Sequence, residues 1–143
     1  MAAPNMTQIL TEQDITYFDA LWLRRAEAKK VQRCIVAFRD ESAPRRSDCH
    51  ANAARWASEN SEATPVHGWL IETDDGHHIR LAAHSLLKDL AGNLFDITPT
   101  HPFDPPFLIH NGGSEEFFAL LPRFNSTIWP AIAGGCHVPP ALD

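Results

Sequence analysis

The sequence has few cysteines, and they are not clustered. Its 143 residues include three, Cys34, Cys49 and Cys136, and no two of them have the CxxC spacing. A disulfide scaffold needs paired cysteines and a cysteine zinc site needs closely spaced ones, so the sequence favours neither. The odd number leaves at least one thiol free.

Basic charge and long apolar runs are also scarce. Lysine and arginine number 12 against 18 acidic residues, for a formal net charge of -6. Binding to phosphates requires clustered positive charge, so we expect neither a nucleic-acid partner nor an anionic membrane partner. No apolar run approaches the roughly 20 residues that cross a bilayer, and residues 1–8 lack the basic and apolar regions of a secretory signal. A cytoplasmic protein is expected.

The remaining composition is that of a folded globular chain. Hydrophobic residues make up 44% and charged residues 21%, and the length suits one domain spanning residues 1–143. Apolar spacing and helix-start signals predict helices at 11–30 and 49–59, the first opened by a capping box at Thr11 and Asp14.

Short apolar and β-branched runs separated by turn residues predict an antiparallel sheet. Its expected strands are 66–72, 79–87, 93–98 and 106–110, with hairpin turns at 74–76 and 89–93. A further short strand is expected at 31–38 and an irregular tail at 122–143. Helices that precede a sheet indicate the α+β class.

Cys49 stands where a nucleophilic thiol is expected. It follows Ser47-Asp48, a candidate N-cap, and so opens the predicted helix at 49–59. Unpaired backbone N–H groups and the positive end of the helix dipole favour a thiolate there. The alternative is a small buried hydrophobic residue, which is a common role for free cysteine.

His84 and Asp96 are expected to meet across a hairpin. Residues opposite each other in an antiparallel pair have a constant sum of residue numbers. If His84 is opposite Asp96, this sum is 180, and the turn is centred on residue 90, inside the predicted turn at 89–93. The two side chains would then share a face, with the carboxylate orienting the imidazole. The alternation of apolar residues along 79–85 places His84 on the opposite face. The helix start must reach that face, or a bulge must intervene.

The order of these three residues resembles a known superfamily. The segments DCHANA (48–53), VHGW (66–69), HSLL (84–87) and LFDITP (94–99) are similar to the papain-like cysteine superfamily, and most of all to its transglutaminase-like branch. The resemblance covers about residues 47–99. Ser85 and Leu86 stand where that branch has an aromatic residue, and no tryptophan or glutamine precedes Cys49 closely enough to donate to an oxyanion.

The resemblance implies a papain-like core and a role for each of the three residues. Cys49 would be the nucleophile, His84 the general base and then acid, and Asp96 the orienter of His84 in a hydrolase or acyltransferase that acts on amide bonds of a peptide or similar substrate. The chemistry proceeds through a thioester and implies no cofactor. Substrate identity, the second oxyanion donor and the oligomeric state stay open.

Three further residues are secondary candidates. His50 adjoins Cys49, but neighbours on a helix point about 100° apart, so we expect it to face away from the sulfur. Asn52 shares roughly the face of Cys49 and could bind a loop near the site, unless it is an ordinary surface amide. Trp69 is expected in the core or in a pocket wall.

Two other functions stay open on the sequence alone. Eight histidines suggest a metal site, with His50, His77, His78, His84, His101 and His110 as the candidates, although no HExxH or comparable ligand spacing occurs. No metal is therefore expected. The other alternative is an inactive papain-like interaction domain in which the polar trio is structural.

Overall fold

The computed structural model describes residues 10–99 and 104–130, and this part of the chain is α+β as expected. It contains three α-helices and a six-stranded sheet: α1 (Glu12–Leu23), α2 (Cys49–Glu59), α3 (Ser114–Phe124), β1 (Gln32–Arg33), β2 (Thr64–Asp74), β3 (Ile79–Lys88), β4 (Leu94–Asp96), β5 (Phe107–Ile109) and β6 (Ser126–Trp129). A short 3-10 helix, η2 (Arg25–Glu27), follows α1. No helix among the described residues combines the length and the apolar character needed to cross a bilayer.

The first helix begins as predicted and ends early. Thr11 and Asp14 form the capping box, each side chain bonding the other residue's backbone N–H. The helix was expected to continue to residue 30, but α1 stops at Leu23. Lys29 instead exchanges two backbone hydrogen bonds with Phe107 of β5, so its backbone pairs with a strand rather than continuing a helix.

The long β2–β3 hairpin is the centre of the sheet. The strand order is β1-β4-β3-β2-β5, and β6 pairs with part of β3. The four strands predicted as an antiparallel sheet do pair in that way, and the added edge strand β1 runs parallel to β4. Both predicted hairpin turns occur, with Gly76 and Gly92 in the left-handed conformation that glycine adopts without steric cost.

The predicted strand at 31–38 is mostly wrong. Only Gln32 and Arg33 pair with a neighbouring strand. Phe38 leaves the sheet and packs with Ala53 of α2 and with Leu87 and Ile97. Burial of this ring against the helix therefore prevailed over the local strand preference.

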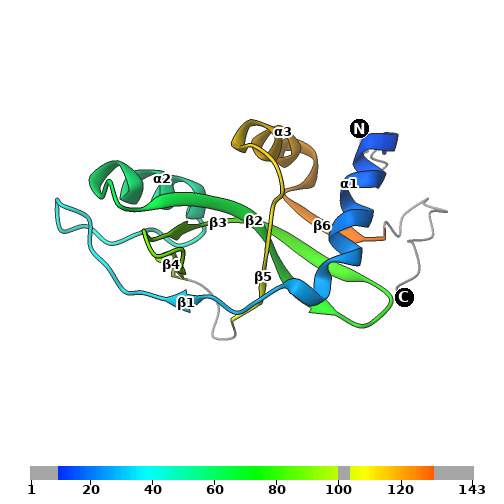
Figure 1. The fold of residues 1–143 in the computed structure, drawn as a ribbon, viewed down its shortest axis with the longest axis horizontal. Helices are drawn as coiled ribbons and strands as arrows, with labels where there is room; N and C mark the ends of the chain where they lie inside the picture. Colours follow the sequence, from blue (N-terminus) through cyan, green and yellow to red (C-terminus); the bar gives the residue numbers. More distant parts are fainter. Residues whose placement is uncertain (1–9, 100–103, 131–143) are drawn as a thin grey trace, which may run out of the picture.

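One face of the hairpin carries the hydrophobic core. Trp69 and Ile71 of β2 and Ile79 and Leu81 of β3 pack against side chains of α1 and α3, which include Phe18, Leu21, Phe117 and Phe124. Leu87, farther along β3, packs against α2. In Figure 1 the three helices lie along one side of the hairpin and β1 lies on the other.

The edge of β3 that faces away from β2 is paired with other strands at both ends but not in its middle. β6 pairs with Ile79–Ala82 and β4 pairs with Leu87–Lys88. A single hydrogen bond, from Ala83 N to Asn125 O, extends the β6 side. The stretch that contains His84 and Ser85 thus lies between two partner strands.

The C-terminal part is more regular than expected. An irregular tail was predicted for 122–143, but Pro122 lies in the last turns of α3. The strand β6 begins two residues after the end of that helix. Arg123 forms an ion pair of 2.6 Å with the buried Asp14, which ties α3 to α1. The rest of the predicted tail, 131–143, lies outside the described residues, as does Cys136.

Candidate active site

Cys49 opens α2, as the sequence predicted. Asp48 is the N-cap residue, and Ser47 before it has a positive φ of 59°, which turns the chain sharply into the helix. The side chain is partly buried. The thiol therefore lies beside the unpaired N–H groups and the positive dipole end of the first helical turn.

His84 and Asp96 form a buried pair. Nε2 of His84 lies 2.6 Å from Oδ2 of Asp96, and the two residues are only 4% and 8% exposed. The other carboxylate oxygen accepts the backbone N–H of Thr98 at 3.0 Å. The carboxylate is thereby fixed in orientation, and Nδ1 of His84 is left for the thiol of Cys49, to which His84 is also hydrogen-bonded.

The register that brings the pair together differs from the predicted one. Leu87 is paired with Phe95, so opposite residues sum to 182 rather than 180. His84 and Asp96 are therefore diagonal neighbours on the same face, a spacing that long side chains still bridge. The β2–β3 pairing has its register shift between Ile71 and Thr73, away from His84, so no bulge accounts for the contact. The start of α2 reaches His84 at the middle of the β3 edge described above.

The thiol and the imidazole shift each other's pKa. Burial is the largest effect on Cys49 and opposes its ionisation, but hydrogen bonds and positive charge from His50 and His84 together lower its pKa to about 6. Burial is also the largest effect on His84 and opposes its protonation. Asp96 and Cys49 outweigh it and raise the pKa of His84 to about 9. Between these values the two groups form a thiolate and imidazolium pair.

His50 does not face away from the sulfur, and that prediction is wrong. Its imidazole is hydrogen-bonded to the thiol of Cys49. Nδ1 of His50 also lies 2.5 Å from the hydroxyl of Ser85. Side chains in a first helical turn tilt toward the N-terminus, so the long imidazole of His50 reaches back to the sulfur despite the offset of about 100° between the two residues.

Asn52 holds the loop that precedes the nucleophile. Its amide nitrogen donates to the carbonyl of Arg45 at 2.8 Å and to the hydroxyl of Thr98 at 2.9 Å. Its oxygen accepts the backbone N–H of Arg45. The residue is buried, so it is not a surface amide. It fixes the approach to Cys49 relative to the end of β4.

Trp69 lies in the core and not in the cleft. It is fully buried, and its Nε1 donates to the hydroxyl of Tyr17 at 2.8 Å. Among the metal candidates, His77 and His78 occupy the β2–β3 turn, and His110 contacts Tyr17. In residues 10–99 and 104–130 no group of three or more potential ligands is placed to hold a metal ion. His101 lies outside these ranges.

A cleft of about 520 Å³ opens beside the thiol. Its walls come from the loop before α2, from β2 and β3, from the turn after β4 and from the junction of α3 and β6, and include Arg46, Glu72, Ala82, Thr98 and Asn125. Sequence reasoning missed Ser85 and His67 near the thiol. One signal was available for Ser85, because a polar residue stands there on the otherwise apolar face of β3.

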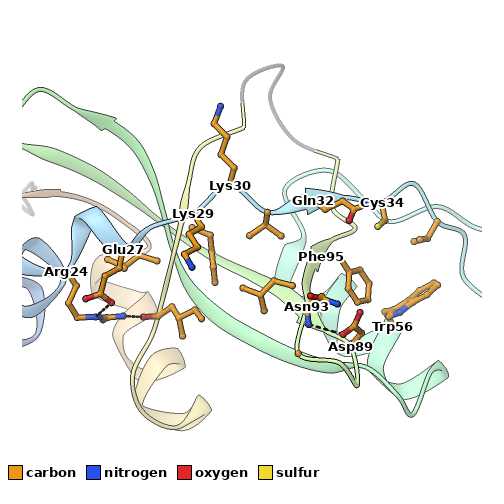
Figure 2. Close-up of a pocket in the computed structure, with 17 residues that line it drawn as sticks. Arg24, Glu27, Lys29, Lys30, Gln32, Cys34, Trp56, Asp89, Asn93 and Phe95 are labelled. Atoms are coloured by element: carbon orange, nitrogen blue, oxygen red, sulfur yellow. Dashed lines mark hydrogen bonds and ion pairs between the residues drawn. The ribbon is translucent and has the colours of Figure 1, made fainter.

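A larger groove, of about 1050 Å³, lies elsewhere. Figure 2 shows it between η2 and β5 on one side and β4 and α2 on the other, with Lys29 and Lys30 along one wall and Trp56 and Phe95 at the far end. Neither Cys49 nor His84 lines it. Its only sulfur is that of Cys34, among the residues that the structure describes.

Comparison of the chain with protein-family models, with curated proteins and with solved structures finds no match.

Proposed function

We propose that the chain is a papain-like cysteine hydrolase or acyltransferase, of the transglutaminase-like kind, that acts on amide bonds. The observation that carries the proposal is the hydrogen-bonded series of Cys49, His84 and Asp96, in which the thiol lies at a helix start and its imidazole partner is oriented by a buried carboxylate. A nucleophile, a base and an orienter in contact, beside an open cleft, are the parts that covalent acyl transfer requires.

In the proposed reaction each step has an atom of this site to carry it. The Cys49 thiolate attacks the carbonyl carbon of an amide, a C–S bond forms, and the carbonyl oxygen becomes an oxyanion beside the N–H groups of the first turn of α2. The amine leaves with the proton from Nδ1 of His84, and a thioester remains. Water or a second amine then attacks the thioester, gives its proton to His84 and releases the thiolate.

The first prediction concerns selective alkylation. At pH 6, iodoacetamide is expected to modify Cys49 about tenfold faster than Cys34 or Cys136, because about half of a thiol with a pKa of about 6 is ionised there. An ordinary thiol with a pKa of about 8.5 is almost fully protonated at that pH, and its greater intrinsic nucleophilicity offsets only part of this difference. The rate at Cys49 should rise as the pH increases through about 6. Peptide mass spectrometry measures each site.

The matched control for this experiment is Cys49→Ser, in which the fast phase must disappear. Equal labelling of the three cysteines at pH 6 would contradict the assignment of the nucleophile. In that case the alternative, an inactive interaction domain of the same fold class, is favoured. The observation that supports this alternative is the large groove, whose aromatic and basic lining lies away from Cys49.

A further inference from the structure

A second set of hydrogen bonds leads to Cys49 through His50, in addition to the set that runs through His84 and Asp96. Oγ of Ser85 lies 2.5 Å from Nδ1 of His50 and 2.7 Å from Nδ1 of His67. Ser85 is 1% exposed. The three residues come from α2, β3 and β2, so the contact exists only in the folded chain. The chemistry described above makes no use of Ser85 or His67.

The two imidazoles are held in place by aromatic rings of α3. His67 stacks on Phe117 with ring centres 5.2 Å apart and planes 15° apart. His50 meets Phe117 and Phe118 edge to face at 5.9 and 5.4 Å. Rotation of either imidazole away from Ser85 would therefore lose a ring contact as well as a hydrogen bond.

The number of protons limits the possible directions of these hydrogen bonds. A serine hydroxyl has one proton, so at least one of the two Nδ1 atoms must donate to it. Burial lowers the pKa of His67, and Coulombic interactions with His50 and His110 add to this effect, which favours the neutral imidazole of His67. A neutral His67 that donates from Nδ1 leaves the Ser85 proton for Nδ1 of His50. When Nδ1 of His50 accepts this proton, the N–H of His50 is on Nε2.

The other titratable groups near this set are accounted for. His50 faces Cys49, Ser85 and His67. His110 donates from Nε2 to the carbonyl of Gly113 and accepts the hydroxyl of Tyr17 at Nδ1, with Glu116 as its acidic neighbour. The side chain of His110 is thus hydrogen-bonded in a neighbouring network, which joins the first through the Phe117 ring and through the backbone hydrogen bond from His110 N to the carbonyl of His67.

We propose that Ser85 and His67 are positioning residues that hold His50 as a second hydrogen-bond donor to the sulfur of Cys49, an inference that rests on the proposed thiol chemistry. The thiolate is then stabilised from two sides, by the imidazolium of His84 and by the N–H of His50. The second donor acts in thioester breakdown: the C–S bond breaks, the electron pair goes to sulfur, and the proton of the attacking water or amine goes to His84.

The test is the pH profile of Cys49 alkylation in Ser85→Ala and, independently, in His67→Phe, which keeps a ring on Phe117. In each variant the midpoint is expected to rise by about one pH unit, which slows the reaction about fivefold at pH 6 and leaves it within about twofold at pH 9. Tyr17→Phe is the control, because it removes hydrogen bonds from the neighbouring network without touching Ser85. Its profile should match that of the wild type.

A double variant distinguishes positioning from a general structural effect. If Ser85 acts through His50, the pair His50→Phe and Ser85→Ala must have the same midpoint as His50→Phe alone. An unchanged midpoint in both Ser85→Ala and His67→Phe, or a fully additive shift in the double variant, would overturn the inference. Failure of the proposed function is distinguishable, because it shows as slow labelling of Cys49 in the wild type.

Discussion

Asp96→Asn is expected to slow the alkylation of Cys49 at pH 6 at least tenfold while the chain stays folded. The carboxylate of Asp96 is the main group that keeps the buried His84 protonated, against the burial that lowers its pKa. Without it, the imidazolium is lost at lower pH, and the thiolate loses its charged partner. The pKa of Cys49 must then rise by at least about one unit, which is at least a fivefold loss of thiolate at pH 6. Without the carboxylate, the imidazole of His84 is also held less firmly in the orientation that faces Cys49.

The sign of the pH dependence is defined by the two pKa values. The thiolate forms as the pH rises through about 6, and the imidazolium of His84 is lost as the pH rises through about 9. Wild-type reactivity that depends on the pair therefore spans pH 6 to 9. In Asp96→Asn the lower limit should move up, so the difference from the wild type is largest at pH 6 and small at pH 9.

The control variant for Asp96→Asn is Asp40→Asn. It makes the same change of charge at an exposed carboxylate that contacts Ser42 and Arg55. Its alkylation profile should equal that of the wild type. His84→Ala should slow alkylation at least as much as Asp96→Asn. Unchanged alkylation in both site variants, together with a stability loss of about 1 to 3 kcal/mol from a broken buried hydrogen bond, would show that the pair is only structural.

Gly68→Ala is expected to destabilise the fold by about 3 kcal/mol, a fall in Tm of roughly 10 °C. A Cβ at this position would lie 2.3 Å from the carbonyl oxygen of Leu108 and 2.7 Å from the ring of Phe107. Gly68 pairs with His84 on one side and with Ile109 on the other, so β5 or the hairpin has to move. Thermal unfolding followed by circular dichroism measures the effect.

Gly113→Ala is the matched control for Gly68→Ala. A Cβ there meets no atom within 4 Å, and the φ of -82° is open to any residue. We expect a loss below about 1 kcal/mol, the usual size for alanine at an N-cap. Equal destabilisation by the two substitutions would contradict the argument from close packing.

The sequence allowed the local parts of the site to be predicted. The start of α2 at Cys49 followed from its N-cap and helix formers, and the β2–β3 hairpin followed from alternation and the turn at Gly76. The shared face of His84 and Asp96 followed from the parity of their residue numbers, although the register itself was two residues off. Each of these features depends on interactions between near neighbours in the chain.

Residues 114–129 show where local reasoning failed. The prolines and the glycine pair of 122–143 predicted an irregular tail, yet Pro122 lies inside α3, whose apolar side buries Phe117 and Phe124 in the core. Burial of these two rings outweighs the cost of a proline in the last turns of the helix. The early end of α1 has the same kind of cause, because the backbone of Lys29 pairs with β5.

By itself, the sequence determined the fold class, the hairpin and the placement of a cysteine at a helix start, since periodicity and capping act over a few residues. Only the tertiary structure decided that β6 and β4 pair with the two ends of β3, so that the start of α2 contacts the unpaired middle of that edge. It also decided that His50, Ser85 and His67 come into contact. The physical reason is that these contacts join residues 18 and 35 positions apart in the chain. Such contacts depend on register and packing, and local patterns do not encode either.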